Sequence, residues 1–210
     1  MVVFSSGPGQ SYVFSIFLDS IISDTGLSRP GISALYLLST VVSAVMVWIV
    51  SRMVDRVGPR MMLVAVGIAF AAACFGMATA TNIFLFYVAF ASLRALGQGS
   101  LNINAILLVN QWFVAYRGRA IAFMGMGAVL STAIFPPMAR ALIDGLGWRQ
   151  AYAVLGVMVM LLIVPVSLLV IRNHPEDMDL LPDGRGQPYP DNAHRRDAVS
   201  QEVASGSQTP

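Results

Sequence analysis

The residues best suited to chemistry in this sequence lie in a segment that is otherwise strongly apolar. Arg94, Gln98 and Asn102 follow one another at intervals of four residues within the stretch 83–109. In an α-helix this spacing puts the three side chains on one face, within about 80° of each other. A guanidinium flanked by two amides can bind an anion or take part in proton coupling, so the three residues predict a polar substrate pathway. The alternative is that Arg94 bonds backbone carbonyls and that the amides only hold helices together.

The elements that must position Arg94 are six apolar stretches, each long enough to cross a bilayer as a helix. A span needs about 20 mostly apolar residues, because a helix rises roughly 1.5 Å per residue through about 30 Å of hydrocarbon. With 56% hydrophobic and 11% charged residues and no strand-like alternation, the sequence predicts an all-α membrane protein. Arg94 then lies roughly 16 Å along its helix, near the midplane, where a charge usually faces a cavity or a partner. The stretches cover residues 2–22, 31–51, 61–79, 83–109, 120–143 and 151–171.

The first stretch supplies two more candidate ligand contacts, Gln10 and Tyr12, which lie deep in the expected span. Ser11, Ser15 and Asp19 repeat the i, i+4, i+8 spacing and so share a face of the same helix. Asp19 is close to the end of the span, and we interpret it as a helix-end carboxylate in contact with water.

Both ends of the chain differ from a regular bundle. Residues 7–9 read Gly-Pro-Gly, which interrupts the first helix early, and no charged leader precedes it. We therefore expect the first helix to be truncated, with its natural start upstream of Met1. Residues 172–210 are polar and rich in Ser, Gln and Pro, a composition that predicts a disordered tail after a bundle at 1–171.

The placement of arginine predicts the orientation in the membrane. If the N-terminus is cytoplasmic, nine arginines fall on the inner side and three on the outer side, which puts both termini in the cytoplasm. The sequence has no lysine, and its arginines form no basic helix face, so a nucleic-acid partner is not predicted. The inner group is Arg52, Arg56, Arg60, Arg117, Arg119, Arg172, Arg185, Arg195 and Arg196, and the outer group is Arg29, Arg140 and Arg149.

Two loops repeat one pattern. Residues 55–60 and 144–149 both read Asp-x-aliphatic-Gly-x-Arg, and each follows the middle helix of an expected set of three. Because three is odd, the two sets would insert in opposite directions, as a 3+3 inverted repeat. Glycine permits a tight turn, and a carboxylate with arginines can tie helix ends together as an inner gate. Positive-inside topology alone would explain the arginines of the first loop but not its acid. The four gate candidates are Asp55, Arg56, Gly58 and Arg60.

The first of these loops resembles a family motif. Residues 51–60 are similar to the loop between the second and third helices of the major facilitator superfamily, Gly-x-x-x-Asp-Arg-x-Gly-Arg-Arg, with Ser51 for the first glycine and Pro59 for one basic residue. Residues 94–99 look like the fourth-helix motif of the family, and residues 147–152 resemble its entry into the sixth helix.

The resemblance implies a carrier of about twelve spans in two halves, with the substrate held between them near the midplane. Residues 7–12, 175–177 and 181–184 resemble the branch of monocarboxylate and oxalate/formate carriers. We therefore expect one half of a secondary active transporter for a small organic solute, in particular an anionic monocarboxylate, with a coupling proton and with a second six-helix half or self-association. The alternative is a truncated, non-transporting membrane remnant or a half-size subunit that acts through a partner.

An enzyme is the least supported class. The spans contain no nucleophile–base pair and no metal-ligand cluster, since the only cysteine is Cys74 and both histidines, His174 and His194, fall in the tail. Cys74 is interpreted as a small apolar filler. No metal and no cofactor are predicted. The expected location is the cytoplasmic membrane.

Overall fold

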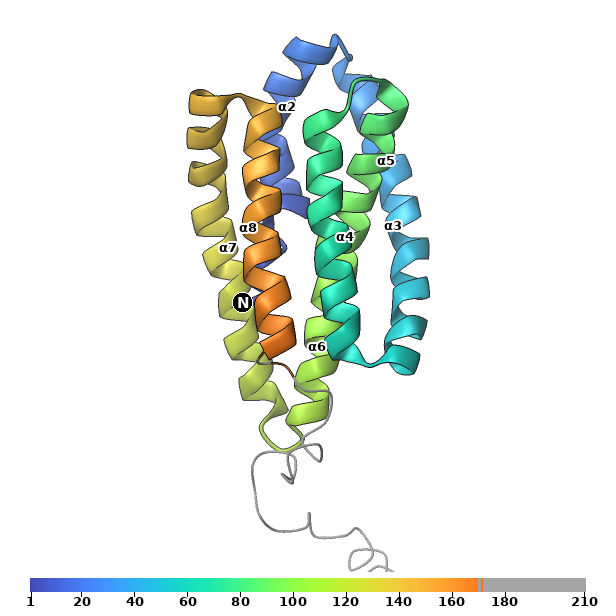
Figure 1. The fold of residues 1–210 in the computed structure, drawn as a ribbon, viewed down its shortest axis with the longest axis vertical. Helices are drawn as coiled ribbons and strands as arrows, with labels where there is room; N and C mark the ends of the chain where they lie inside the picture. Colours follow the sequence, from blue (N-terminus) through green and yellow to red (C-terminus); the bar gives the residue numbers. More distant parts are fainter. Residues whose placement is uncertain (170, 172–210) are drawn as a thin grey trace, which may run out of the picture.

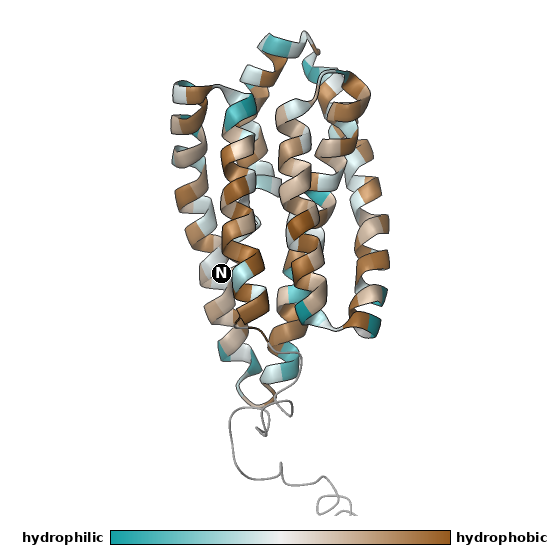
Figure 2. Ribbon diagram, viewed as in Figure 1, coloured by the Kyte–Doolittle hydropathy of each residue, from teal (hydrophilic) through white to brown (hydrophobic). Residues whose placement is uncertain are grey.

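The computed structural model describes residues 1–169 and 171, and its regular structure in that range is entirely helical (Figure 1). Five helices there are long and apolar enough to cross a membrane. They run side by side along the long axis of the bundle, with apolar residues along their lengths and polar residues gathered toward their ends (Figure 2). The five are α3 (Arg29–Val57), α4 (Pro59–Thr79), the continuous stretch Ile83–Trp112, α7 (Arg117–Leu146) and α8 (Trp148–Leu169).

The first expected span is not one helix, so the expected six spans are not all present as continuous helices. It consists of α1 (Val2–Ser5), the 3₁₀ turn η1 (Gly7–Gly9) and α2 (Ser11–Thr25). The predicted interruption at Gly-Pro-Gly is confirmed: Gln10 after η1 is extended, at φ −86° and ψ 152°. Proline lacks a backbone N–H and glycine favours other conformations, so a continuous helix is lost here. With 15 residues, α2 is shorter than the roughly 20 that a span requires.

The stretch around Arg94 is also less regular than expected. It begins as α5 (Ile83–Leu93), continues as a π-helix, η2 (Arg94–Ser100), and ends as α6 (Leu101–Trp112). The expectation of an unbroken α-helix over 83–109 is therefore wrong at 94–100. Short π segments inside α-helices are uncommon and frequently occur at functional sites.

The two loops of the sequence repeat have the same backbone geometry. Gly58, between α3 and α4, has φ 86° and ψ 152°, and Gly147, between α7 and α8, has φ 83° and ψ 159°. Each glycine N–H donates to the carbonyl four residues earlier, at 2.9 Å in both turns. Positive φ with extended ψ is essentially restricted to glycine, which explains why both loops carry it at this place.

The core lies mainly around α4 and α8, which pack against each other in opposite directions. Phe70, Cys74, Tyr152 and Leu155 are fully or almost fully buried between the helices, so Cys74 fills space in the core, as expected. By contrast only 11% of the apolar windows of α3 and α7 is buried, against 56% of that of α4. The apolar surfaces of α3 and α7 therefore face outward from this bundle.

Candidate functional site

Arg94 lies at the first position of η2 and is only 5% exposed. One terminal nitrogen of its guanidinium donates to Ser11 Oγ of α2 at 3.4 Å, and the other donates to Thr40 Oγ1 of α3 at 3.5 Å. The guanidinium carbon lies 3.9 Å from the centre of the Tyr36 ring, a cation–π distance. Arg94 thus joins three elements that are far apart in the sequence.

The bonding of this guanidinium is incomplete. Both hydrogen bonds are long, both acceptors are neutral hydroxyls, and the Nε atom is buried with no hydrogen-bond partner. Among the described side chains, none of the ion pairs involves Arg94. A buried charge is costly unless it is paired, and an anion is the kind of group that could pair with the Arg94 guanidinium and accept a hydrogen bond from its Nε.

Ser11 and Tyr36 complete the polar surroundings of Arg94. Their hydroxyl oxygens are 2.7 Å apart, within hydrogen-bond distance. Tyr36 also packs near Phe14 and Phe90, with ring centres 6.3 and 6.1 Å away. These aromatic rings hold the Tyr36 face under the guanidinium.

The other two members of the predicted stripe do not share the burial of Arg94. Gln98 is exposed, and the Asn102 side-chain amide donates to the Gln98 backbone carbonyl at 2.8 Å. Asn104 is the buried amide of this helix instead, with no exposed surface and an Oδ1 that has no partner. The π-helix has wider turns than an α-helix, so the spacing rule used for the sequence does not apply across residues 94–100.

The side chains of Gln10 and Tyr12 form hydrogen bonds with residues other than Arg94 and its partners. The Gln10 amide donates to Ser6 Oγ at 3.0 Å. Tyr12 Oη lies 2.8 Å from Ser131 Oγ on α7, and Ser131 in turn donates to the Phe4 carbonyl at 2.9 Å. Since Ser131 has one hydrogen, Tyr12 is the donor in the first of these bonds. The structure therefore places Tyr12 in a link between α2 and α7.

A close crossing of two glycines brings η1 against η2. A Cβ atom added to Gly9 would lie 2.5 Å from the Leu93 carbonyl oxygen and 2.9 Å from Gly97 Cα. A Cβ atom added to Gly97 would lie 2.9 Å from Gly9 Cα and 2.7 Å from the Phe70 ring. Only residues without a side chain fit here, and the crossing sets the distance between α2 and the helix that carries Arg94.

The predicted gate loop lies at the α3–α4 turn. Arg56 is exposed in the last turn of α3, and Gly58 forms the turn itself. Arg60 donates to the Leu168 carbonyl at the end of α8, at 2.6 Å. The side chain of Asp55 lies outside the described part of the structure.

A matching contact occurs at the other end of the α4–α8 pair. Arg149, at the start of α8, donates to the Ala80 carbonyl just after α4 at 3.3 Å and pairs with Asp24 at 2.9 Å. Trp148 also donates to Asp24, at 3.2 Å. Each arginine of the repeated motif thus reaches the carboxyl end of the other helix.

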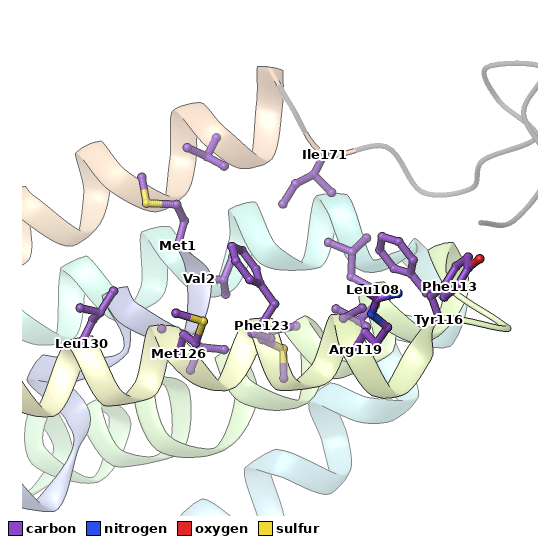
Figure 3. A pocket seen from close by; sticks show the side chains of 17 residues that line it. Met1, Val2, Leu108, Phe113, Tyr116, Arg119, Phe123, Met126, Leu130 and Ile171 are labelled. Carbon is purple, nitrogen blue, oxygen red and sulfur yellow. The ribbon is translucent and has the colours of Figure 1, made fainter. Parts of the chain in front are cut away.

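A cavity of about 760 Å³ lies apart from the Arg94 site (Figure 3). It lies beside the N-terminal residues, between α6, α7 and the end of α8, and its walls are almost entirely apolar, with Arg119 and Tyr116 near one end. A cavity of this kind lacks the convergent polar groups that orient a charged solute.

Comparison with known proteins decides the family. The sequence profile of the Major Facilitator Superfamily matches residues 1–203. The chain belongs to the Major Facilitator Superfamily. The resemblance seen in the loop and fourth-helix motifs is thereby confirmed, and residues 172–203 of the match lie outside the described part of the structure.

Two members of the superfamily are similar to this chain over most of its length. The riboflavin transporter RibJ of Trypanosoma brucei brucei is 26% identical over 183 residues, which cover 85% of this chain and 33% of the relative. The probable L-galactonate transporter of Escherichia coli K12 is 26% identical over 140 residues, 66% of this chain and 31% of the relative. The chain spans about a third of the length of both relatives. The first relative is a transporter of riboflavin and the second a probable transporter of L-galactonate.

Proposed function

We propose that this chain is part of a secondary active transporter that carries a small organic anion, a monocarboxylate in particular, across the cytoplasmic membrane. The observation that carries the proposal is the state of Arg94. Arg94 is only 5% exposed, and among the described residues its guanidinium contacts neutral groups and has an unpartnered Nε. A carboxylate is the ligand that best satisfies such a guanidinium, because it accepts two parallel hydrogen bonds and neutralises the charge.

The structural contacts also favour a carrier that moves by alternating access. The 3+3 inverted repeat inferred from the loops is supported by the equal geometry of Gly58 and Gly147. It is further supported by the reciprocal bonds of Arg60 to Leu168 and of Arg149 to Ala80. Repeats of this kind place the substrate at their interface and allow one bundle to rock against another. In this arrangement the first helix of the repeat is the discontinuous α1–η1–α2 segment.

A complete passage requires a second set of helices. The apolar faces of α3 and α7 point outward, and we propose that a second six-helix half, or a second copy of this chain, packs there. In the membrane we place the α3–α4 and α6–α7 turns, with their arginines, and both termini on the cytoplasmic side. A proton is the proposed coupling ion.

The likeness to the L-galactonate transporter supports an anionic substrate, since galactonate is itself a carboxylate. The likeness to a riboflavin transporter does not favour an anion, because riboflavin carries no charge. Arg94 is the feature of this chain that favours the anion.

The experiment compares binding of labelled lactate, acetate and pyruvate to the whole chain in lipid nanodiscs, before and after Arg94→Gln. We expect carboxylate binding to fall at least ten-fold, because a charge-assisted pair is lost. Arg140→Gln is the matched control, since Arg140 is exposed and pairs only with Asp144 on its own helix. Equal binding by the Arg94→Gln variant and the unmodified chain would overturn the proposal.

The second candidate is a membrane subunit that does not transport. The outward apolar faces of α3 and α7 favour it as much as they favour a second half. Uptake of the same acids into vesicles separates the two, because a subunit of this kind would insert into the membrane and leave the uptake rate at the level of empty vesicles.

A further inference from the structure

A second cavity, of about 510 Å³, leads from the surface toward Arg94 between α2 and α3. Arg29 lines it near the turn between α2 and α3. The Arg29 side chain is 75% exposed and pairs with Asp19, which is similarly exposed, at 3.0 Å. Ser11 and Tyr36 line it as well, and both of them also contact Arg94. The cavity therefore runs from the exposed guanidinium of Arg29 to the hydroxyl groups of Ser11 and Tyr36, which lie against the buried guanidinium of Arg94.

The walls of this cavity are mostly apolar, with Leu18, Ile32 and Leu37 among them, and serine hydroxyl groups interrupt them. Ser15 and Ser33 lie in it from opposite helices. The Ser15 hydroxyl donates to the Tyr12 carbonyl at 3.0 Å, and the Ser33 hydroxyl donates to the Arg29 carbonyl at 3.1 Å. Each serine has used its hydrogen, so both offer acceptor lone pairs to the cavity.

This arrangement selects the chemistry of the ligand. A carboxylate has no hydrogen to donate, so it can bind a guanidinium but not the lone pairs of Ser15 and Ser33 while their hydroxyl hydrogens stay on the backbone carbonyls. An apolar chain would leave those lone pairs without partners, whereas hydroxyl groups on the ligand can donate to them. Phe14 and Tyr36 supply aromatic surface against which the C–H groups of such a chain can pack.

We propose that the α2–α3 cavity is a binding subsite for the hydroxylated chain of an organic acid whose carboxylate is directed to Arg94. Within the monocarboxylates, a polyhydroxylated acid should therefore bind more tightly than a simple one. The Ser11–Tyr36 pair separates the two parts of the site and opens when the carboxylate replaces the long bonds from Arg94. This inference rests on the proposed function of Arg94 and adds the specificity for hydroxyl groups.

The test uses gluconate and hexanoate, two six-carbon monocarboxylates that differ in their hydroxyl groups. Binding of each labelled acid to the whole chain in nanodiscs is measured for the unmodified chain, Ser33→Ala, Ser15→Ala and Arg94→Gln. Ser23→Ala is the matched control, because Ser23 is an exposed serine of α2 whose hydroxyl also bonds a backbone carbonyl, outside the cavity.

We expect gluconate to bind at least ten-fold more tightly than hexanoate, and each cavity serine variant to weaken gluconate about five-fold, the range of one neutral hydrogen bond. Hexanoate binding should be unchanged by both serine variants, and Ser23→Ala should have no effect on either acid. Arg94→Gln should weaken both acids. Because Ser15 and Ser33 are exposed, their alanine variants leave the core intact.

Two results would contradict the inference in different ways. If hexanoate binds as tightly as gluconate, or the serine variants leave gluconate unchanged while Arg94→Gln weakens both acids, the subsite is wrong and the proposed function stands. If neither acid binds, or Arg94→Gln leaves gluconate binding unchanged, the proposed function fails and the subsite fails with it.

Discussion

The crossing of Gly9 in η1 and Gly97 in η2 is too close for a side chain at either position, so a substitution there should lower the free energy of unfolding. Gly9→Ala would place a Cβ atom 2.5 Å from the Leu93 carbonyl oxygen and 2.9 Å from Gly97 Cα, and both of these are backbone atoms that cannot rotate away. Restoring an ordinary contact of 3.4 Å requires η1 and the Arg94 helix to separate by about 0.9 Å.

Overpacking of this kind costs about 1–3 kcal/mol. The alanine also restricts the unfolded chain, which offsets about 0.4–1 kcal/mol of that loss. We therefore expect Gly9→Ala to be destabilised by roughly 1–2 kcal/mol, a loss of several degrees in the midpoint of thermal unfolding in detergent. The same separation would lengthen the bond from Arg94 to Ser11, which is already 3.4 Å, so anion binding should weaken as well.

Gly125→Ala is the control, because a Cβ atom on this helical glycine of α7 meets nothing within 4 Å. In a helix the change from glycine to alanine is favourable by up to about 1 kcal/mol, so the midpoint should rise or stay constant. Thermal unfolding followed by tryptophan fluorescence, at equal detergent concentration, compares the two variants. If Gly9→Ala unfolds at the same temperature as Gly125→Ala, the packing argument at this crossing is refuted.

Two further contacts allow predictions of the same kind. Arg60→Ala and Arg149→Ala each remove a bond that joins α4 to α8, and Arg149→Ala also removes the ion pair with Asp24. Each loss should be at least about 0.5–1 kcal/mol, and because the two arginines lie at opposite ends of the helix pair, the losses should add in the double variant, as measured by thermal unfolding. A double variant no less stable than either single one would contradict this. Tyr12→Phe should lower the free energy of unfolding by about 1 kcal/mol in the unmodified chain. In a Ser131→Ala background it should have almost no effect, because the Tyr12–Ser131 bond is already lost there. A double-mutant cycle with an interaction energy near zero would show that this bond contributes nothing.

Much of the fold could be predicted from the sequence, because hydropathy fixes where helices cross a membrane. The helices from α3 to α8 lie where the apolar stretches predict them, although α3 extends through Val57 and so beyond the predicted end at residue 51. The loop glycines were also predictable, since only glycine takes the backbone angles of the Gly58 and Gly147 turns. These features depend on local sequence alone.

The surroundings of Arg94 could not be predicted to the same degree. Its partners Tyr36 and Thr40 lie on another helix, more than fifty residues earlier, and nothing in their local sequence indicates a contact with a guanidinium. The predicted partners Gln98 and Asn102 depended on an unbroken α-helix. The π-helical segment replaces that geometry because its hydrogen bonds are set by the packing of η2 against α3 and η1, which local spacing does not contain.

The widened turns of η2 also bear on how such a site can change shape. A π segment holds more residues per turn than the α-helices on either side of it, so tightening it to α geometry turns α5 and α6 relative to each other about their common axis. Arg94, at the first position of this segment, would then change direction relative to the helix that follows it. A side chain at this junction can thus be reoriented by winding within one helix.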